Sequence, residues 1–236
     1  MALTRQQLAS MIEHTLLKPE ATTAQIVALC DEAIAWGFAA VCVNPIHAGR
    51  AAMRLRGANV RVVSVAGFPL GASCTSAKVE EARRAVADGA TEVDMVLRIG
   101  DLIDNEVHAV RDDVAAVAEA VHEASPGHAL KVILETAALS EAQIVRGCEL
   151  CAEAGADYLK TSTGFHPAGG ASVAAVRLLS EQGRRFGMKV KAAGGIRDRM
   201  TAESMVAAGA SRLGMSASVS VMESFAEGDR GQGARA

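Results

Sequence analysis

The sequence predicts a single-domain α/β fold, the (β/α)8 or TIM barrel, with an extra N-terminal helix. Short β-rich runs alternate with helix-length segments throughout the 236 residues. Four helical segments end at a glycine that precedes such a run, at Gly37, Gly89, Gly155 and Gly209. Glycine adopts the left-handed conformation that ends many helices. Strands that alternate with helices form parallel sheets, and eight such units in about 250 residues fit a closed barrel.

The expected elements follow one another in a regular order. Thr4 and Gln7 have the spacing of a capping box and predict the N-terminal helix, and a second helix is expected from near Thr22. Residues 14–17 lie between them and form a short first strand. The other seven predicted strands are residues 40–43, 60–65, 92–96, 130–134, 158–160, 189–191 and 212–214.

An open, doubly wound sheet is the alternative fold. It is disfavoured because no G-x-G-x-x-G turn follows the first strand. No linker interrupts the chain, so residues 1–226 are expected to form one catalytic domain. Residues 227–236 are expected to be a disordered tail.

Composition favours small-molecule chemistry. A net charge of −3 and an aromatic content of 3% predict no nucleic-acid partner. The chain has no run of eighteen apolar residues and no signal-peptide pattern, so we expect a cytoplasmic protein without a membrane partner.

Cysteine and histidine spacing predicts no metal site. The five cysteines are odd in number and lie in apolar or helical settings, which indicates reduced thiols. Cys148 and Cys151 have C-x-x-C spacing but fall within a helical pattern, where packing is the better interpretation. The six histidines show neither H-x-H nor H-E-x-x-H spacing.

Polar residues gather where the predicted strands end. In a barrel the site lies at the carboxyl ends of the strands. The side chains and glycines expected there are Asp94, Lys131, Glu135, Lys160, Thr161, Ser162, Thr163, Lys191, Gly194, Gly195 and Ser216.

Lys160 and Lys191 stand at the ends of neighbouring strands. A lysine amine has a reference pKa of about 10.4 and attacks carbonyls only where burial or a second cation lowers that pKa. With Asp94 to relay a proton, the pair matches an amine that forms a Schiff base beside a neighbour that lowers its pKa. The alternative is an interior lysine that a carboxylate neutralises.

Two glycine-containing segments end the last two strands, Gly194-Gly195 and Gly214-Met215-Ser216. Barrels build phosphate sites at these places from backbone N–H groups and a helix N-terminus. A tight strand-to-helix turn is the alternative for Gly194-Gly195. Two such segments together favour a phosphorylated substrate.

Seven motifs, in order, resemble the shorter bacterial form of the deoxyribose-phosphate aldolase family. The resemblance covers residues from about 10 to 225. Its motifs are IEHTLLKP (12–19), VCVNP (41–45), VAGFPLG (65–71), EVDMV (92–96), LKVILET (130–136), KTSTGF (160–165) and KAAGGI (191–196).

The resemblance implies a class I aldolase that uses neither metal nor cofactor. It would reversibly cleave 2-deoxy-D-ribose 5-phosphate to D-glyceraldehyde 3-phosphate and acetaldehyde. Proteins of the family are often homodimers. By similarity, Lys160 forms the Schiff base, Lys191 lowers its pKa, Asp94 shuttles protons, Lys131 supports that network, Thr163 and Cys42 line the pocket, and Gly194, Gly195 and Ser216 hold the phosphate.

The sequence departs from the family pattern at three places. Glu13 stands where aspartate is usual, which could shift contacts to a substrate hydroxyl. Ala217 replaces a common second serine and predicts weaker phosphate binding, by about 1 kcal/mol for one lost hydrogen bond. The tail also lacks the terminal tyrosine of some longer relatives.

Two other functions stay open from the sequence. One is a lysine-dependent barrel aldolase that acts on a different phosphorylated or keto-acid substrate. The other is a barrel that binds sugar phosphates without covalent chemistry, such as an isomerase, in which both lysines only neutralise anions. Retained function in Lys160→Arg would favour the second.

Overall fold

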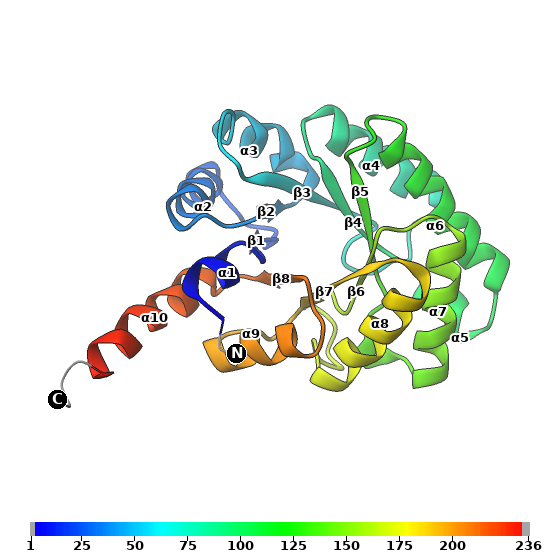
Figure 1. Ribbon diagram of the computed structural model, residues 1–236. Coiled ribbons are helices and arrows are strands. Elements are labelled where there is room, and N and C mark those ends of the chain that lie inside the picture. The colour runs from blue at the N-terminus through cyan, green and yellow to red at the C-terminus, as the bar shows by residue number, and fades with distance from the viewer. Residues whose placement is uncertain (1–2, 233–236) are drawn as a thin grey trace.

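The computed structural model describes residues 3–232 and contains a closed barrel of eight parallel strands, which confirms the predicted fold (Figure 1). Each strand pairs with the next, and β8 pairs with β1, so the open-sheet alternative is wrong. Every predicted strand is present, and its ends lie within two residues of the prediction. The strands are β1 (Ile12–Leu16), β2 (Ala40–Val43), β3 (Arg61–Ala66), β4 (Glu92–Val96), β5 (Ala129–Ile133), β6 (Tyr158–Lys160), β7 (Lys189–Ala193) and β8 (Arg212–Met215).

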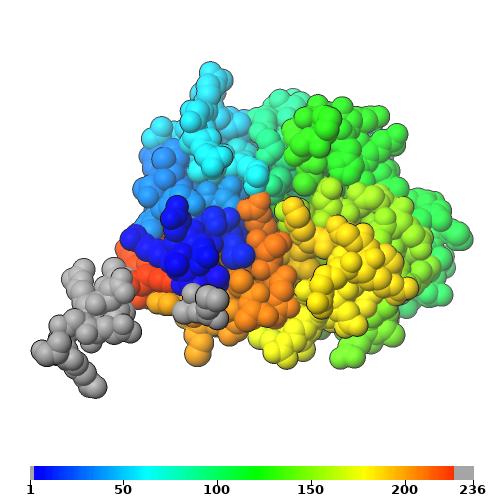
Figure 2. All heavy atoms as spheres, in the orientation of Figure 1, coloured from blue at the N-terminus to red at the C-terminus, as the bar shows by residue number. Residues whose placement is uncertain are grey.

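Helices surround the barrel (Figure 1). Thr4 caps the N-terminal helix α1 and Thr22 caps α2, each through the predicted capping box. In Figure 2 the N-terminal segment (blue) packs beside the C-terminal part of the chain. The helices are α1 (Arg5–Ala9), α2 (Thr23–Trp36), α3 (Ala48–Arg54), α4 (Thr75–Ala87), α5 (Ile99–Ile103), α6 (Val107–His122), α7 (Glu141–Glu153), α8 (Val173–Phe186), α9 (Arg199–Ala207) and α10 (Ser218–Gln232), with 3-10 turns η1 (Pro45–His47) and η2 (Thr136–Ala138).

The last helix runs past the predicted end of the domain. Residue 226 falls inside α10 (Ser218–Gln232), so residues 227–232 of the predicted tail are helical. No proline interrupts this stretch. Residues 233–236 lie outside the described residues.

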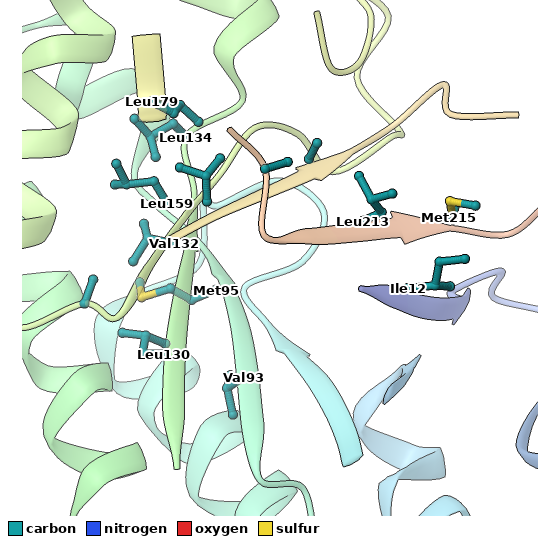
Figure 3. Close-up of a cluster of buried hydrophobic side chains, with 14 of the residues drawn as sticks. Ile12, Val93, Met95, Leu130, Val132, Leu134, Leu159, Leu179, Leu213 and Met215 are labelled. Atoms are coloured by element: carbon teal, nitrogen blue, oxygen red, sulfur yellow. The ribbon is translucent and has the colours of Figure 1, made fainter. Parts of the chain in front are cut away.

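An apolar layer separates the strands from the helices (Figure 3). Side chains alternate between the two faces of a strand. On β4, Val93 and Met95 are buried in this outer layer, and on β5 Leu130 and Val132 do the same. The same alternation turns the intervening residues of β4 and β5 toward the barrel interior.

The barrel interior is divided between apolar and charged residues. A small apolar cluster on the side of the first three strands consists of Ala40, Cys42, Val63 and Val65 with Leu17. The buried charged residues of the interior come mainly from β1 and β4–β7, namely Glu13, Glu92, Asp94, Lys131, Lys160 and Lys191. The fold therefore concentrates charge on one side of the barrel axis.

The cysteines do not form disulfides in the described structure. Cys148 and Cys151 are buried in α7, as predicted, and burial raises the pKa of Cys148 to about 12. Among residues 3–232, no helix is long and apolar enough to cross a membrane.

Candidate active site

The two predicted lysines lie side by side. Lys160 on β6 and Lys191 on β7 are partners in the register of the two strands. Both ammonium groups donate to the same oxygen, Asp94 Oδ2, at 2.7 Å from Lys160 Nζ and 2.6 Å from Lys191 Nζ. Lys160 is 2% exposed and Asp94 is fully buried. The structure thus brings together the three residues that the sequence selected.

A third lysine and two glutamates extend this cluster. Lys131 is the register partner of Asp94 and donates to Asp94 Oδ1 at 3.1 Å. Its Nζ also lies 2.5 Å from Glu92 Oε2. Glu13 on β1 forms an ion pair with Lys191. A buried charge requires such partners, because leaving it unpaired away from water is costly.

The cluster holds an excess of positive charge. Its three lysines face three carboxylates, those of Glu13, Glu92 and Asp94. The guanidinium of Arg212 lies 4.0 Å from both Glu13 and Glu92, at the base of the cluster. With Arg212 included, four cations face three carboxylates, so the loss of one lysine proton would balance the charges of this cluster.

The pKa shifts differ between the three lysines. Burial lowers the pKa of Lys160, Asp94 opposes this effect, and the Lys191 charge adds to it. Burial also disfavours the charge on Lys191, but Asp94 and Glu13 outweigh it and raise its pKa. The pKa of Lys131 is raised by Asp94, Glu13 and Glu92 against the same burial effect. Lys160 is the member of the three that loses its proton first.

Asp94 remains ionised in this setting. Burial alone would raise the pKa of its carboxyl group, but the charges of Lys131, Lys160 and Lys191 hold it well below the usual range. The carboxylate therefore serves as a shared acceptor between the lysines.

A cavity of about 300 Å³ opens above Lys160 at the carboxyl ends of the strands. One side is formed by the predicted phosphate segments, with Gly194, Gly195, Gly214 and Ser216 in the lining. Two exposed cations that the sequence analysis did not select, Lys18 and Arg197, also line it. Apolar side chains complete the wall, including Leu17, Phe165 and Ile196. The cavity can hold a small anionic substrate within reach of the amine.

The glycines of this wall have different structural reasons. Gly194 and Gly195 have φ of 91° and 81°, a left-handed conformation that side chains rarely adopt. A Cβ on Gly214 would lie 2.9 Å from Cε of Lys191 and 3.1 Å from Cβ of Ala193. Gly214 thus leaves room for the stem of Lys191, a role that its place in a phosphate segment did not predict.

Thr163 and Cys42 occupy different positions relative to the cavity. Thr163 lines it, but its hydroxyl donates to Glu135 at 2.5 Å and accepts the Phe165 N–H at 3.1 Å. Cys42 is fully buried among apolar residues on β2 and is not part of this lining. Burial raises the pKa of the Cys42 thiol to about 11.

Sequence reasoning missed several members of the site. Glu13, which the sequence marked only as a departure from the family pattern, is fully buried and pairs with Lys191. Lys18 lies two residues after the end of β1, so its position just beyond a strand end was a usable signal. Arg197 follows the Gly194-Gly195 segment by two residues. Within residues 3–232, no three His, Cys, Asp or Glu side chains are grouped to hold a metal ion.

The chain is similar over most of its length to one family of aldolases. The model of the DeoC/LacD family of aldolases matches residues 8–222. A deoxyribose-phosphate aldolase from Thermococcus kodakarensis is 49% identical over 224 residues, which are 94% of this chain and 98% of the relative. One from Mycolicibacterium paratuberculosis is 50% identical over 228 residues, covering 94% and 99%.

A solved structure of a deoxyribose phosphate aldolase has the same fold. The tetrameric deoxyribose phosphate aldolase from Aeropyrum pernix superposes with a TM-score of 0.87 at 34% identity. The match covers 94% of this chain and 92% of that one. The similarity therefore extends over nearly the whole length of both proteins.

Proposed function

The chain belongs to the DeoC/LacD family of aldolases, and from this premise we propose that it is a deoxyribose-phosphate aldolase. It reversibly cleaves 2-deoxy-D-ribose 5-phosphate to D-glyceraldehyde 3-phosphate and acetaldehyde through a Schiff base. The observation that carries the assignment of residues is the pair of lysine nitrogens on one Asp94 oxygen, below a cavity.

The first step is imine formation. The neutral amine of Lys160 attacks C1 of the open-chain sugar, and the adduct takes up one proton on its C1 hydroxyl and loses water to give a protonated imine. Burial and Lys191 favour the neutral amine that this step needs. The imine cation then takes the place of the ammonium group beside Asp94.

The second step breaks the C2–C3 bond of the sugar. Its electron pair moves into the imine and leaves an enamine on Lys160, while the C3 hydroxyl loses its proton and becomes the aldehyde of glyceraldehyde 3-phosphate. We assign the transfer of this proton, and its later delivery to C2 of the enamine, to Asp94 and Lys191 acting through a water. Hydrolysis of the resulting imine releases acetaldehyde and restores Lys160. Lys131 holds the second oxygen of Asp94 throughout.

The phosphate end of the substrate lies against the glycine-containing wall. Backbone N–H groups at Gly194, Gly195 and Gly214 and the hydroxyl of Ser216 are the proposed donors. Lys18 and Arg197 supply positive charge at the same cavity. Binding the phosphate orients C1 toward Lys160. Thr163 and Cys42 contribute to the shape of the pocket and of the interior below it.

The assembly is inferred from the family resemblance and the location from the cysteines. We infer a homodimer, as the family resemblance implies, while the Aeropyrum pernix relative is tetrameric. Sedimentation velocity distinguishes the two assemblies. Four of the five cysteines are buried and none is paired in the described structure, which suits a reducing cytoplasm.

Reductive trapping tests the proposal. The protein is incubated with acetaldehyde and borohydride, and the modified peptide is mapped by mass spectrometry. One reduced two-carbon unit on Lys160, together with cleavage of deoxyribose 5-phosphate, is the expected result. An adduct spread over surface lysines, or none, would remove the Schiff-base assignment and favour a barrel that binds sugar phosphates without covalent chemistry.

A further inference from the structure

Two loops meet above Lys160. The loop after β3 carries Phe68, and the loop after β6 carries Phe165. Their rings pack edge to face, with centroids 5.3 Å apart and an interplanar angle of 87°. Lys160 Nζ lies 6.0 Å from the centre of the Phe68 ring, and Phe165 lines the cavity. The two rings therefore close one side of the space in which the imine would form.

Glu135 has an unusual conformation and environment for a charged residue. Its φ of 59° and ψ of 56° place it in the left-handed region, which is strained for residues other than glycine. Its side chain is 1% exposed, and no ion pair joins it within the described part of the chain. Burying a carboxylate without a cation is unfavourable unless hydrogen bonds replace its water. The strained backbone and the buried carboxylate each cost free energy, which indicates that Glu135 has a functional reason to occupy this position.

Within the described residues, the Glu135 side chain accepts all of its hydrogen bonds from one residue. Thr163 Oγ1 donates to Glu135 Oε2 at 2.5 Å, and the Thr163 N–H lies 3.3 Å from each carboxylate oxygen. Thr163 Oγ1 in turn accepts the Phe165 N–H at 3.1 Å. A continuous set of hydrogen bonds thus runs from Glu135 through Thr163 to the backbone of Phe165.

We propose that Glu135 is a positioning residue which, through Thr163, holds Phe165 against Phe68 above Lys160 and thereby limits the size of the aldehyde that can form the imine. This inference rests on the proposed function. Glu135 touches neither Lys160 nor Asp94 in the described contacts, so it acts through the loop and not on the reacting atoms. The strain and burial at Glu135 are explained if the loop needs one acceptor for both donors of Thr163.

Competitive trapping tests the proposal. Equal concentrations of acetaldehyde and propanal compete for Lys160 in the presence of borohydride, and mass spectrometry counts the two adducts. In Glu135→Gln one acceptor oxygen is lost, and in Thr163→Val the hydroxyl is lost at nearly constant shape. We expect the preference for acetaldehyde to fall about tenfold in each variant, since one methylene is the unit being discriminated. Thr163→Ser keeps the hydroxyl and should lose far less.

A double-mutant cycle separates this role from two independent defects. If Glu135 acts through Thr163, the double variant loses no more selectivity than the worse single variant. Val117→Ala, which opens a cavity in the outer apolar layer, is the control for lost stability and should keep the wild-type ratio. If Glu135→Gln does not fold, the comparison of Thr163→Val with Thr163→Ser carries the test.

The outcomes distinguish the two proposals. No adduct on Lys160 of the wild-type protein would overturn the proposed function itself. A wild-type adduct together with an unchanged aldehyde ratio in Glu135→Gln and Thr163→Val would overturn only the role of Glu135. Additive losses in the double variant would also contradict it, because the two residues would then act separately.

Discussion

Lys78 and Lys160 are two buried lysines in different regions of the molecule, and each donates to an aspartate oxygen at the same distance. Lys78 on α4 donates to Asp113 Oδ2 of α6 at 2.7 Å, between the barrel and the helices. Lys160 donates to Asp94 Oδ2 at the same distance inside the barrel. Burial lowers the pKa of both lysines. Distance and burial alone therefore do not distinguish a structural lysine from a reactive one.

The difference lies in how the counter-ion is shared and in access. Lys78 and Asp113 are both fully enclosed, and Lys78 also donates to the Val96 carbonyl at 3.0 Å. Asp94, in contrast, forms ion pairs with Lys160 and with two further lysines, and Lys160 lines a cavity. A second cation and space for a carbonyl group are thus what the interior of the barrel adds.

Replacing the nucleophile should have the largest effect. Lys160→Arg keeps the charge but removes the amine, so we expect cleavage of deoxyribose 5-phosphate to fall about 10⁴-fold or more. No two-carbon adduct should form. Lys189→Arg alters an exposed lysine on the neighbouring strand and is the matched control. Substantial cleavage by Lys160→Arg would mean that charge alone suffices at this position.

Removing the second cation should make Lys160 more like Lys78. In Lys191→Met the pKa of Lys160 rises, because the Lys191 charge that disfavours its protonation is gone. Less neutral amine is then present at pH 7, and the loss of the proton relay adds to the defect, so kcat/KM should fall about 10³-fold. The acidic limb of the pH profile should move to higher pH. Lys191→Arg should restore that limb toward its wild-type position, and an unshifted limb in Lys191→Met would refute the pKa argument.

Breaking the Lys78–Asp113 ion pair should lower the stability of the protein and leave the reaction at Lys160 unchanged. Lys78→Met leaves the Asp113 carboxylate buried without its cation and should cost about 3–5 kcal/mol of unfolding free energy. The double change Lys78→Met with Asp113→Leu should recover most of that loss. Urea denaturation measures both, and trapping with acetaldehyde should still modify Lys160. Equal stability of the single and double variants would show that the unpaired charge is not the cause.

A smaller change tests the room left for Lys191. Gly214→Ala places a methyl group against the Lys191 stem, so kcat should fall about tenfold through displacement of the ammonium group. Gly100→Ala is the control, because a Cβ there meets nothing within 4 Å. If kcat is unchanged and only KM rises, Gly214 serves the phosphate and not the lysine.

The smallest expected effect is on the binding of the substrate phosphate at the glycine-containing wall. Ala217→Ser adds a hydroxyl next to Ser216 and should lower KM for the phosphorylated sugar about fivefold, which corresponds to about 1 kcal/mol for one hydrogen bond. KM for unphosphorylated 2-deoxyribose is the internal control and should not change. An equal change for both sugars would place the new hydroxyl away from the phosphate.

The sequence by itself determined the order of the elements and the identity of the central residues. Capping boxes and glycine helix ends are local signals, and they located α1 and α2 correctly. The alternation of side chains along β4 placed Asp94 inward, and the position of Lys160 and Lys191 on consecutive strands made them neighbours. These features depend on residues close together in the chain.

Only the tertiary structure decided which charges meet. Glu13 and Lys191 are 178 residues apart and pair because β1 and the last strands come together when the barrel closes. Glu135 and Thr163 likewise meet from the segments that follow β5 and β6, and Gly214 of β8 leaves space for Lys191 of β7. No local pattern encodes such pairs, since they depend on strand register around the closed sheet and on the packing of side chains inside it.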